Sequence, residues 1–389
     1  MTHAQPPRLS VQIFAGGGPL PTAVGGTQRR WPGRHGIVVR LIDRDGQSGL
    51  GEASPLPGLS RESLQGCAQT LAHSAVWLPQ APSSADDALS ALADLADRAD
   101  LAARPAAQFA IESALLDLWA RQRGVSVAVL LGGARPYRRV ACNALCAAVA
   151  DGLGAVARGV RTLKIKVGGP DFAAEQALLQ TLRRALGPDV ALRLDANGAW
   201  TVPQARQHLA QLVDVAPQYV EQPVPPGQMA ALGPVPVPVA ADESLLHTPE
   251  WDAAERAMLL DPARCAAWVI KPALMGLRAA YRLALQAQAH GVGVVITHAF
   301  DGPVGLAAAC ELALALPNPP WACGLDRHAG LAAWPAVDLP QPSPVGTAAA
   351  EICASDSVGL GIDAADALCA ALSPYPTSAE GPDAAPHAP

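Results

Sequence analysis

The chain has 389 residues and a formal net charge of -6, and 50% of its residues are hydrophobic against 16% that are charged. This balance predicts a packed globular protein rather than a disordered one, long enough for one large core or two domains. The mildly acidic charge gives no basic face, so we expect no nucleic-acid partner.

The N-terminal residues and the cysteines indicate the compartment. No charged start is followed by an apolar core, and no uninterrupted apolar run approaches about 18 residues, so we expect neither a secretory signal nor a membrane segment. Cys142 and Cys146 have a spacing that fits no metal or redox motif. We expect the eight cysteines to be small buried residues that stay reduced in the cytoplasm.

The first region, residues 1–137, is predicted to be an α+β domain, because β-rich segments precede a helical stretch. Residues 16–26 hold five glycines and are expected to form a flexible loop. Apolar residues recur at helical spacing over 109–124, and Gly124 suits the C-cap of that helix. The β-rich segments are VQIF (11–14) and GIVVRLID (36–43).

The second region, 138–335, alternates short apolar runs with helical stretches, which predicts a parallel (β/α) barrel. The polar residues that end successive runs are 21 to 29 residues apart, about the length of one βα unit. The third region, 336–389, is rich in Pro, Ala and Gly; we expect part of it to return to the first domain and its end to be a disordered tail. The eight runs are RVACNAL (139–145), TLKIKV (162–167), ALRLD (191–195), QYVEQ (218–222), VPVAADE (237–243), AWVIK (267–271), GVVIT (293–297) and WACGL (321–325).

Charged residues stand at the ends of five of these runs. Because all strands of a parallel barrel end on one face, these side chains are expected to converge at one mouth. They are Lys164 and Lys166 on the second run, Asp195 on the third, Glu221 on the fourth, Asp242 on the fifth and Lys271 on the sixth.

The acids Asp195, Glu221 and Asp242 would repel one another in one cleft unless they shared a cation. Hard oxygen ligands without His or Cys favour Mg²⁺, with Mn²⁺ as an alternative, over zinc. We therefore predict that the three acids hold a divalent metal. The alternative is that they are ordinary strand-end charges in salt bridges.

The lysines are the predicted acid–base groups. Lys164 and Lys166 are two residues apart in a strand, so both side chains face the barrel mouth. Neighbouring ammonium groups and a metal cation disfavour protonation, which predicts that one of these lysines approaches neutrality and serves as a general base. Lys271 would lie across the barrel, where it could stabilise negative charge or act on the opposite face of the substrate. The alternative is that all three lysines pair structurally with the acids.

These groups indicate removal of a proton next to the carboxylate of a small-molecule substrate. A metal at both carboxylate oxygens would stabilise the enediolate that forms when a lysine takes the proton. Epimerisation, cycloisomerisation or β-elimination could follow.

Five motifs along the chain resemble those of the muconate-lactonising-like branch of the enolase superfamily, and the layout of residues 10–335 is similar to that branch. The resemblance implies an α/β fold in which an N-terminal α+β capping domain covers a modified (β/α)8 TIM-type barrel. It also implies Mg²⁺ held by the third, fourth and fifth strands. The motifs are K-I-K (164–166), L-D-A-N (194–197), V-E-Q-P (220–223), A-D-E-S (241–244) and V-I-K-P (269–272).

Within that branch, three segments look most like the o-succinylbenzoate synthase family of menaquinone biosynthesis. That family dehydrates 2-succinyl-6-hydroxy-2,4-cyclohexadiene-1-carboxylate to 2-succinylbenzoate. The resemblance implies that Lys166 takes the α-proton and then protonates the departing hydroxyl. It implies that Lys271 stabilises the planar intermediate by a cation–π contact and that Lys164 tunes Lys166. The segments are G-L-G-E-A-S-P-L-P-G-L-S-R-E (49–62), F-A-I-E-S-A-L-L-D-L (109–118) and G-L-D-R-H-A-G-L (324–331).

The resemblance also implies residues on the substrate side of the site. Ser54 and Leu56 lie in the segment that resembles a substrate-covering loop, and Arg193 and Asn197 would support the metal ligands or the substrate. The glycine that starts G-P-V-G, Gly302, could offer its backbone N–H to a substrate carboxylate.

The sequence departs from the family at His298, where the family often has a small serine. This residue could line the succinyl subsite, indicate a different substrate, or be a buried histidine with a structural role. An N-acylamino acid racemase or dipeptide epimerase of the same superfamily stays open, because lysines on opposite faces permit two-sided proton transfer. A non-catalytic binding protein is a third hypothesis. The sequence is compatible with a monomer or a homo-oligomer.

Overall fold

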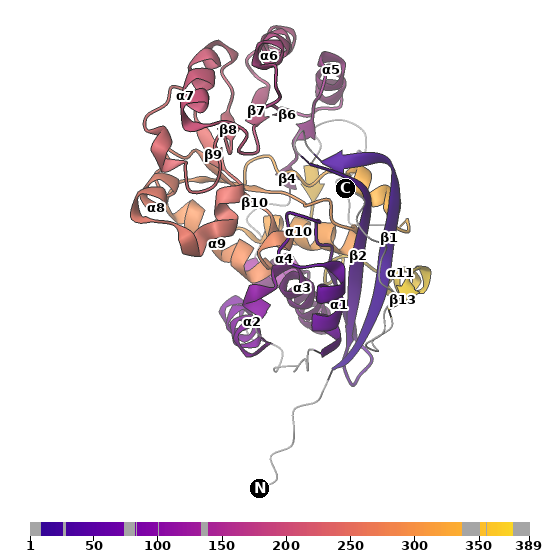
Figure 1. Cartoon of the computed structure of the whole chain (residues 1–389). Helices are drawn as coiled ribbons and strands as arrows, with labels where there is room; N and C mark the ends of the chain where they lie inside the picture. Colours follow the sequence, from indigo (N-terminus) through magenta and orange to yellow (C-terminus); the bar gives the residue numbers. More distant parts are fainter. Residues whose placement is uncertain are drawn as a thin grey trace.

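The computed structural model has a cap and a barrel that pack against each other (Figure 1). The cap contains the N-terminal sheet and helices, and the barrel strands follow it in the chain. The structure describes residues 9–25, 29–73, 82, 84–99, 101–133, 139–336, 351–354 and 356–375. The end of the predicted tail therefore lies outside the described residues.

The cap is an antiparallel sheet with helices packed against it. Its strand order is β13-β1-β2-β3, so a segment near the C-terminus pairs with the first strand. The long helix α3 packs against β3 and β2. As expected, Gly124 follows that helix with a positive φ of 63°. The strands are β1 (Ser10–Gly25), β2 (Arg30–Ile42), β3 (Ser48–Ala53) and β13 (Ser373–Pro374), and the helices are α1 (Leu64–His73), α2 (Ala85–Ala99), α3 (Pro105–Gln122) and α4 (Val127–Gly132).

The glycine-rich stretch that was expected to be a loop is instead part of the β1–β2 hairpin, except for Gly26, which lies outside the described residues. Gly16 pairs with Gly36 across the two strands. A Cβ on either glycine would collide with the indole of Trp334. The prediction was wrong because these glycines make room for a buried aromatic side chain rather than for a turn.

Another glycine sets the distance between the sheet and α3. A Cβ on Gly51 would overlap the carbonyl oxygen of Ala110 on α3. We expect Gly51→Ala to lower the free energy of unfolding by about 3 kcal/mol or more, because backbone rather than a flexible side chain would have to move. Urea unfolding measures this change.

The matched control is Gly154→Ala on helix α5 (Val149–Ala157), where the nearest atom to an added Cβ is 3.5 Å away on Arg158. Alanine in a helix is favoured over glycine, so the control is expected to gain roughly 0.5–1 kcal/mol. Equal effects of the two substitutions would contradict the packing argument.

The barrel sheet has seven parallel strands in the order β11-β10-β9-β8-β7-β6-β5. The predicted strands from 162 to 297 all appear in it, one after another, with helical segments between them. These strands are β5 (Ala144–Leu145), β6 (Thr162–Lys166), β7 (Ala191–Asp195), β8 (Tyr219–Glu221), β9 (Val239–Ala241), β10 (Ala267–Ile270) and β11 (Gly293–Ile296). The helices between and after these strands are α5, α6 (Phe172–Leu186), α7 (Val202–Gln211), α8 (Ala253–Leu259), α9 (Leu277–Ala289) and α10 (Pro303–Ala315). Helix α11 (Ala365–Ala371) lies beside the cap sheet (Figure 1), and short 3-10 turns lie along the chain at 101–103, 213–215, 230–232, 243–250, 272–274 and 329–333.

The first and last expected strands, which meet where the barrel closes, form less regular strand structure than predicted. The first splits into β4 (Arg139–Ala141), which pairs with β12 (Glu351–Cys353), and β5. The last, 321–325, forms only isolated bridges, from Cys323 to Cys142 and from Gly324 to Thr297. Backbone hydrogen bonds on both sides of this segment nevertheless join the two edges of the sheet. The fold is a modified (β/α)8 barrel with an N-terminal α+β cap.

Buried carboxylates fasten the cap to the barrel. Glu52 of β3 accepts the backbone N–H groups of Val304 and Gly305 at the start of α10, each at 3.0 Å. Glu112 of α3 accepts the N–H of Arg278 at the start of α9 at 2.9 Å. Burial raises the pKa of Glu52 and of Glu112 to about 7. These acids satisfy the free N–H groups of barrel helices from across the domain boundary.

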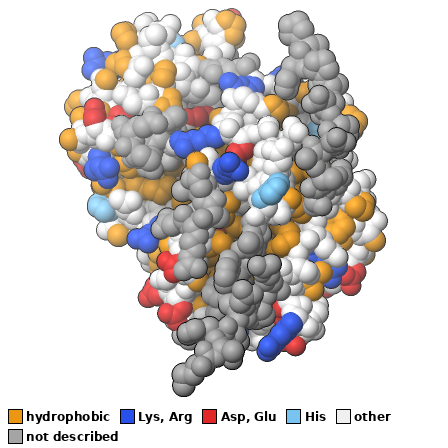
Figure 2. Space-filling model, turned by 60° about the horizontal axis from the view of Figure 1, so that its bottom comes forward, with side chains coloured by type: hydrophobic (Ala, Val, Ile, Leu, Met, Phe, Trp, Pro, Cys, Tyr) orange, Lys and Arg blue, Asp and Glu red, His pale blue; other side chains and the backbone are white. Residues whose placement is uncertain are grey.

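Among the described helices, none combines the length and the apolar character that crossing a bilayer requires. On the face drawn in Figure 2, the coloured Lys and Arg side chains are interspersed with apolar and acidic ones and form no continuous basic area.

Candidate active site

The three predicted acids meet at the carboxyl ends of neighbouring barrel strands. Asp195 ends β7 and Glu221 ends β8, in register with each other, and Asp242 follows β9 directly. All three are buried, and each offers a carboxylate oxygen within 4.8 Å of the others. The parallel strands thus bring side chains from three βα units to one point.

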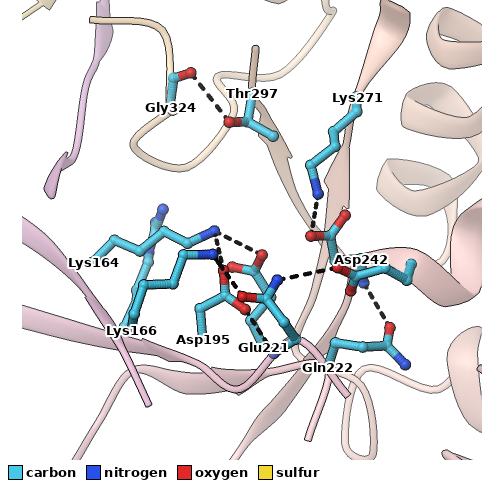
Figure 3. Close-up of polar contacts among 12 residues, drawn as sticks. Lys164, Lys166, Asp195, Glu221, Gln222, Asp242, Lys271, Thr297 and Gly324 are labelled. Atoms are coloured by element: carbon cyan, nitrogen blue, oxygen red, sulfur yellow. Dashed lines mark hydrogen bonds and ion pairs between the residues drawn. The ribbon is translucent and has the colours of Figure 1, made fainter. Parts of the chain in front are cut away.

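The lysines flank this cluster on two sides, with the acids between them (Figure 3). Lys164 Nζ lies 2.8 Å from Asp195 Oδ2 and 2.7 Å from Glu221 Oε1. Lys166 Nζ lies 2.6 Å from Asp195 Oδ2. On the other side, the Lys271 ammonium forms an ion pair with Asp242. The structural salt-bridge alternative predicts the same contacts.

Burial and the neighbouring charges shift the pKa values of Asp195 and Glu221 in opposite directions. Burial by itself would raise the pKa of Asp195, but the ammonium groups of Lys164 and Lys166 outweigh it and hold this pKa well below its usual range. Burial and the nearby Asp195 charge raise the pKa of Glu221 well above its usual range. One buried oxygen of Glu221, Oε2, has no hydrogen-bond partner among the described residues. Glu221 is therefore the acid whose charge the lysines compensate least.

The donor set fits a hard divalent cation. All three side chains offer carboxylate oxygen, with no sulfur or imidazole among them, which is the chemistry that Mg²⁺ or Mn²⁺ prefers. The unpartnered Glu221 oxygen is a ligand atom that no protein group satisfies among the described residues. A metal would compensate the charge that raises the pKa of this acid.

The acids that contact Lys164 determine the direction of its pKa shift. Burial disfavours its ammonium, but attraction by Asp195, Glu221 and Asp242 is stronger in sum and raises the pKa of Lys164. The prediction that one of the two lysines approaches neutrality included a bound metal cation, and it stays a prediction.

A pocket opens above the cluster, between the barrel mouth and the cap. Gly25, Trp31 and Leu56 line it from the cap side, and Lys166 and Lys271 line it from the barrel. Trp31 Nε1 donates to the carbonyl of Pro57 at 3.1 Å, so the β1–β2 hairpin is tied to the segment that contains Leu56. A second cavity adjoins the first, because Lys166 and Lys271 line both. Asp326 and His328 also line this second cavity.

Asn197, Leu56 and His298 lie where the sequence analysis expected them, on the wall of this pocket. Asn197 Oδ1 accepts a hydrogen bond of 2.8 Å from Lys166 Nζ, and its Nδ2 donates to Glu243. Asn197 therefore orients the predicted base. Asn197 also has a left-handed backbone, with a φ of 47°.

The structure places three other expected substrate contacts differently. The Gly302 N–H donates to Glu52, and the Ser54 hydroxyl donates to the same carboxylate, so both are used inside the protein. Arg193 is buried under the mouth, where its Nε donates to Gln218 at 2.7 Å and its guanidinium packs on Tyr219. The sequence patterns identified these three groups as candidates. They did not show that the Glu52 carboxylate accepts from the first two, or that Gln218 and Tyr219 contact the third.

Two residues of this region were not singled out from the sequence. Arg34 is buried and donates to the carbonyls of Ser54 (2.7 Å) and Phe300 (2.8 Å), which joins the cap loop to the barrel loop. His328 lies against His298, with ring centroids 4.0 Å apart. No local pattern marks Arg34, but His328 lies in the G-L-D-R-H-A-G-L segment that was already quoted.

His328 predicts a pH dependence of stability. Burial, with a smaller contribution from Arg34, lowers the pKa of His328 to about 3, whereas a histidine in an unfolded chain titrates near pH 6.5. Between these values the unfolded chain binds a proton that the folded chain does not, so this residue costs stability as the pH falls. We expect His328→Phe to gain up to about 2 kcal/mol over the wild type on going from pH 8 to pH 5.

Urea unfolding at both pH values measures this difference. His290→Phe, at an exposed position, reports the part of the effect that does not depend on burial. A His328→Phe difference that stays constant with pH would contradict the assignment.

Comparisons with known proteins agree with this architecture. The profile "Enolase C-terminal domain-like" matches residues 145–368, and "Mandelate racemase / muconate lactonizing enzyme, N-terminal domain" matches residues 17–132. An o-succinylbenzoate synthase of Thermosynechococcus vestitus is 33% identical over 312 residues, which are 76% of this chain and 84% of that protein. An L-Ala-D/L-Glu epimerase of Bacillus subtilis is 30% identical over 295 residues, 72% of this chain and 78% of that protein.

Solved structures show the same fold. A muconate lactonizing enzyme from Pseudomonas fluorescens matches with a TM-score of 0.76 at 23% identity, over 94% of this chain and 99% of that one. The cap, the barrel and the cluster of acids and lysines at its mouth define an enzyme of the capped-barrel class. The chain belongs to the enolase superfamily, in its mandelate racemase / muconate lactonizing enzyme branch.

Proposed function

We propose that the chain is an o-succinylbenzoate synthase of menaquinone biosynthesis, a carbon–oxygen lyase that dehydrates 2-succinyl-6-hydroxy-2,4-cyclohexadiene-1-carboxylate to 2-succinylbenzoate. The observation that carries this is the buried acid cluster with lysines on both sides, beneath a pocket that cap and barrel residues line together. Relatives named o-succinylbenzoate synthase support this reaction: one in Thermosynechococcus vestitus is 33% identical over 76% of this chain, and one in Thermobifida fusca is 39% identical over 43% of it.

The acids would hold Mg²⁺, or Mn²⁺ in its place, through Asp195, Glu221 and Asp242. The ion would supply positive charge beside the substrate carboxylate as negative charge develops there. Lys164, released from its contacts with Asp195 and Glu221, would hold the same carboxylate by charge.

Lys166 would carry the proton. Its Nζ, oriented by Asn197, accepts the hydrogen on the ring carbon that bears the carboxylate. The same ammonium then returns that proton to the hydroxyl on the neighbouring carbon as the C–O bond breaks, so that water leaves and the ring becomes aromatic. Lys271, on the other side of the cluster, would face the opposite side of the ring and stabilise its negative charge.

A turnover assay tests this proposal. The purified protein with Mg²⁺ is offered the cyclohexadiene carboxylate, and aromatisation is followed by ultraviolet absorbance. We expect multiple turnovers that stop when the metal is chelated. Racemisation of an N-succinyl amino acid or a dipeptide, with no dehydration, would overturn the proposal.

One observation favours an epimerase as the second candidate. Asp326 lines the larger cavity, and no hydrogen bond or ion pair joins its carboxylate to another described side chain. Such a group could bind the ammonium of a dipeptide. If the protein is an epimerase, Asp326→Asn should raise KM for a dipeptide while leaving KM for acylated substrates unchanged. Absence of turnover with every one of these substrates would favour a non-catalytic binding protein.

A further inference from the structure

The loop that follows β11, residues 297–302, is held in place along its whole length. The His298 N–H donates to the carbonyl of Gly324 at 3.0 Å, and the Ala299 N–H donates to Asp301 at 3.0 Å. Phe300 has a left-handed backbone with a φ of 55°, which is costly for an aromatic residue and is maintained only where the surroundings impose it. Arg34 imposes it here by donating to the Phe300 carbonyl at 2.8 Å.

This backbone conformation determines which nitrogen of His298 carries its proton. The Phe300 N–H points back at the His298 ring and donates to Nδ1 at 3.1 Å. Nδ1 must therefore be an acceptor, so the hydrogen of the neutral ring lies on Nε2. Burial and the nearby His328, Lys164, Lys271 and Arg34 lower the pKa of His298 well below its usual range, in agreement with a neutral ring.

The position of the ring is also determined. The rings of His298, His328 and Phe300 form a cluster, in which the His298 centroid lies 4.0 Å from His328 and 5.4 Å from Phe300, and the latter two lie 5.7 Å apart. It lines both cavities of the pocket, each of which it shares with Lys166 and Lys271. No described residue bonds to its Nε2, and this atom is not among the fully enclosed unpartnered atoms, so it is open to the pocket.

We propose that His298 is a specificity-determining residue whose Nε2–H donates a hydrogen bond to a carbonyl oxygen of the substrate, in the part that extends away from the carboxylate at the acids. The substrate class is thus a carboxylate with an acyl or keto oxygen on its side chain. The inference rests on the proposed function for its ligand, since the succinyl ketone of 2-succinylbenzoate is such an oxygen. An ammonium at this place would find a donor where it needs an acceptor.

Two substitutions separate this role from a structural one. His298→Asn keeps an acceptor where Nδ1 receives the Phe300 N–H but removes the donor at Nε2. His298→Gln keeps an amide N–H close to the position of Nε2 but loses the Nδ1 acceptor. A role limited to holding the loop would spare the Asn variant, and a role in binding the carbonyl would spare the Gln variant.

The measurement is calorimetric binding, with Mg²⁺ present, of 2-succinylbenzoate and of the analogue whose ketone is replaced by a methylene group. We expect the wild type to bind the ketone about tenfold more tightly than the methylene analogue. The Asn variant should bind the two ligands equally, at the level of the analogue, and the Gln variant should keep most of the difference. Retention of the tenfold preference in the Asn variant, with its loss in the Gln variant, would overturn the proposal.

The turnover assay of the wild type tests the proposed function separately. A wild type that distinguishes the two ligands but does not dehydrate the cyclohexadiene would remove the synthase and leave the role of His298 in place. A wild type that dehydrates its substrate but binds both ligands equally would remove the role of His298 alone.

Discussion

Replacement of Lys166 by alanine is expected to lower kcat/KM by about 10³-fold or more, because the proposed reaction begins with transfer of a proton to this amine. The fold and the metal site should survive. The Lys166 side chain is 30% exposed, and it is not one of the three proposed ligands. We therefore expect the melting temperature and the Mg²⁺ affinity to stay close to those of the wild type. Steady-state kinetics, thermal unfolding and calorimetric titration measure the three quantities.

The control for this variant is Arg184→Ala, which removes one positive charge from an exposed position on helix α6. It should leave activity unchanged. Lys166→Ala with activity near that of the wild type would exclude this residue as the base. A loss of activity accompanied by an equal loss of Mg²⁺ affinity would mean that Lys166 acts through the metal site instead.

The second large effect is expected for Glu221→Gln, which should weaken Mg²⁺ binding by about a hundredfold or more. The amide removes the charge of the acid that the lysines compensate least. Stability shows the change without any assay of activity. At a Mg²⁺ concentration of 100 times the wild-type Kd, the wild type should gain about 2.7 kcal/mol, and a variant that binds a hundredfold more weakly should gain about 0.4 kcal/mol.

Urea unfolding with Mg²⁺ and with chelator measures these gains. Asp189→Asn removes one negative charge at an exposed position and serves as the control, with a gain like that of the wild type. A Glu221→Gln protein that Mg²⁺ stabilises as much as the wild type would show that Glu221 is not a ligand.

The order of elements was readable from the sequence because the barrel repeats one unit. Each βα unit ends its strand at the same face, so acids spaced by one unit, such as Asp195 and Glu221, were predicted to meet, and they lie in register. The six polar residues at the mouth could therefore be named without coordinates. The closing segment 321–325 was located correctly, although it forms bridges rather than a full strand.

The errors arose where a distant residue decides what a local pattern does. Gly16 was expected in a loop, but it makes room for Trp334, which is more than 300 residues away in the sequence. The N–H of Gly302 looked free to bind a substrate until Glu52 of the cap was found to occupy it. The guanidinium of Arg193 contacts Gln218 and the Tyr219 ring instead of lining the pocket. A single sequence contains no information on which long-range partner takes a donor.

The most direct test of the account is a crystal structure of the protein grown with Mn²⁺, with the ion located by its anomalous scattering. The account predicts one strong peak bounded by Asp195, Glu221 and Asp242, at about 2.0–2.2 Å from an oxygen of each, with Lys164 and Lys271 moved off these carboxylates. A map with no peak there, and with the lysines still paired to the acids, would contradict the proposed metal site and the chemistry that depends on it.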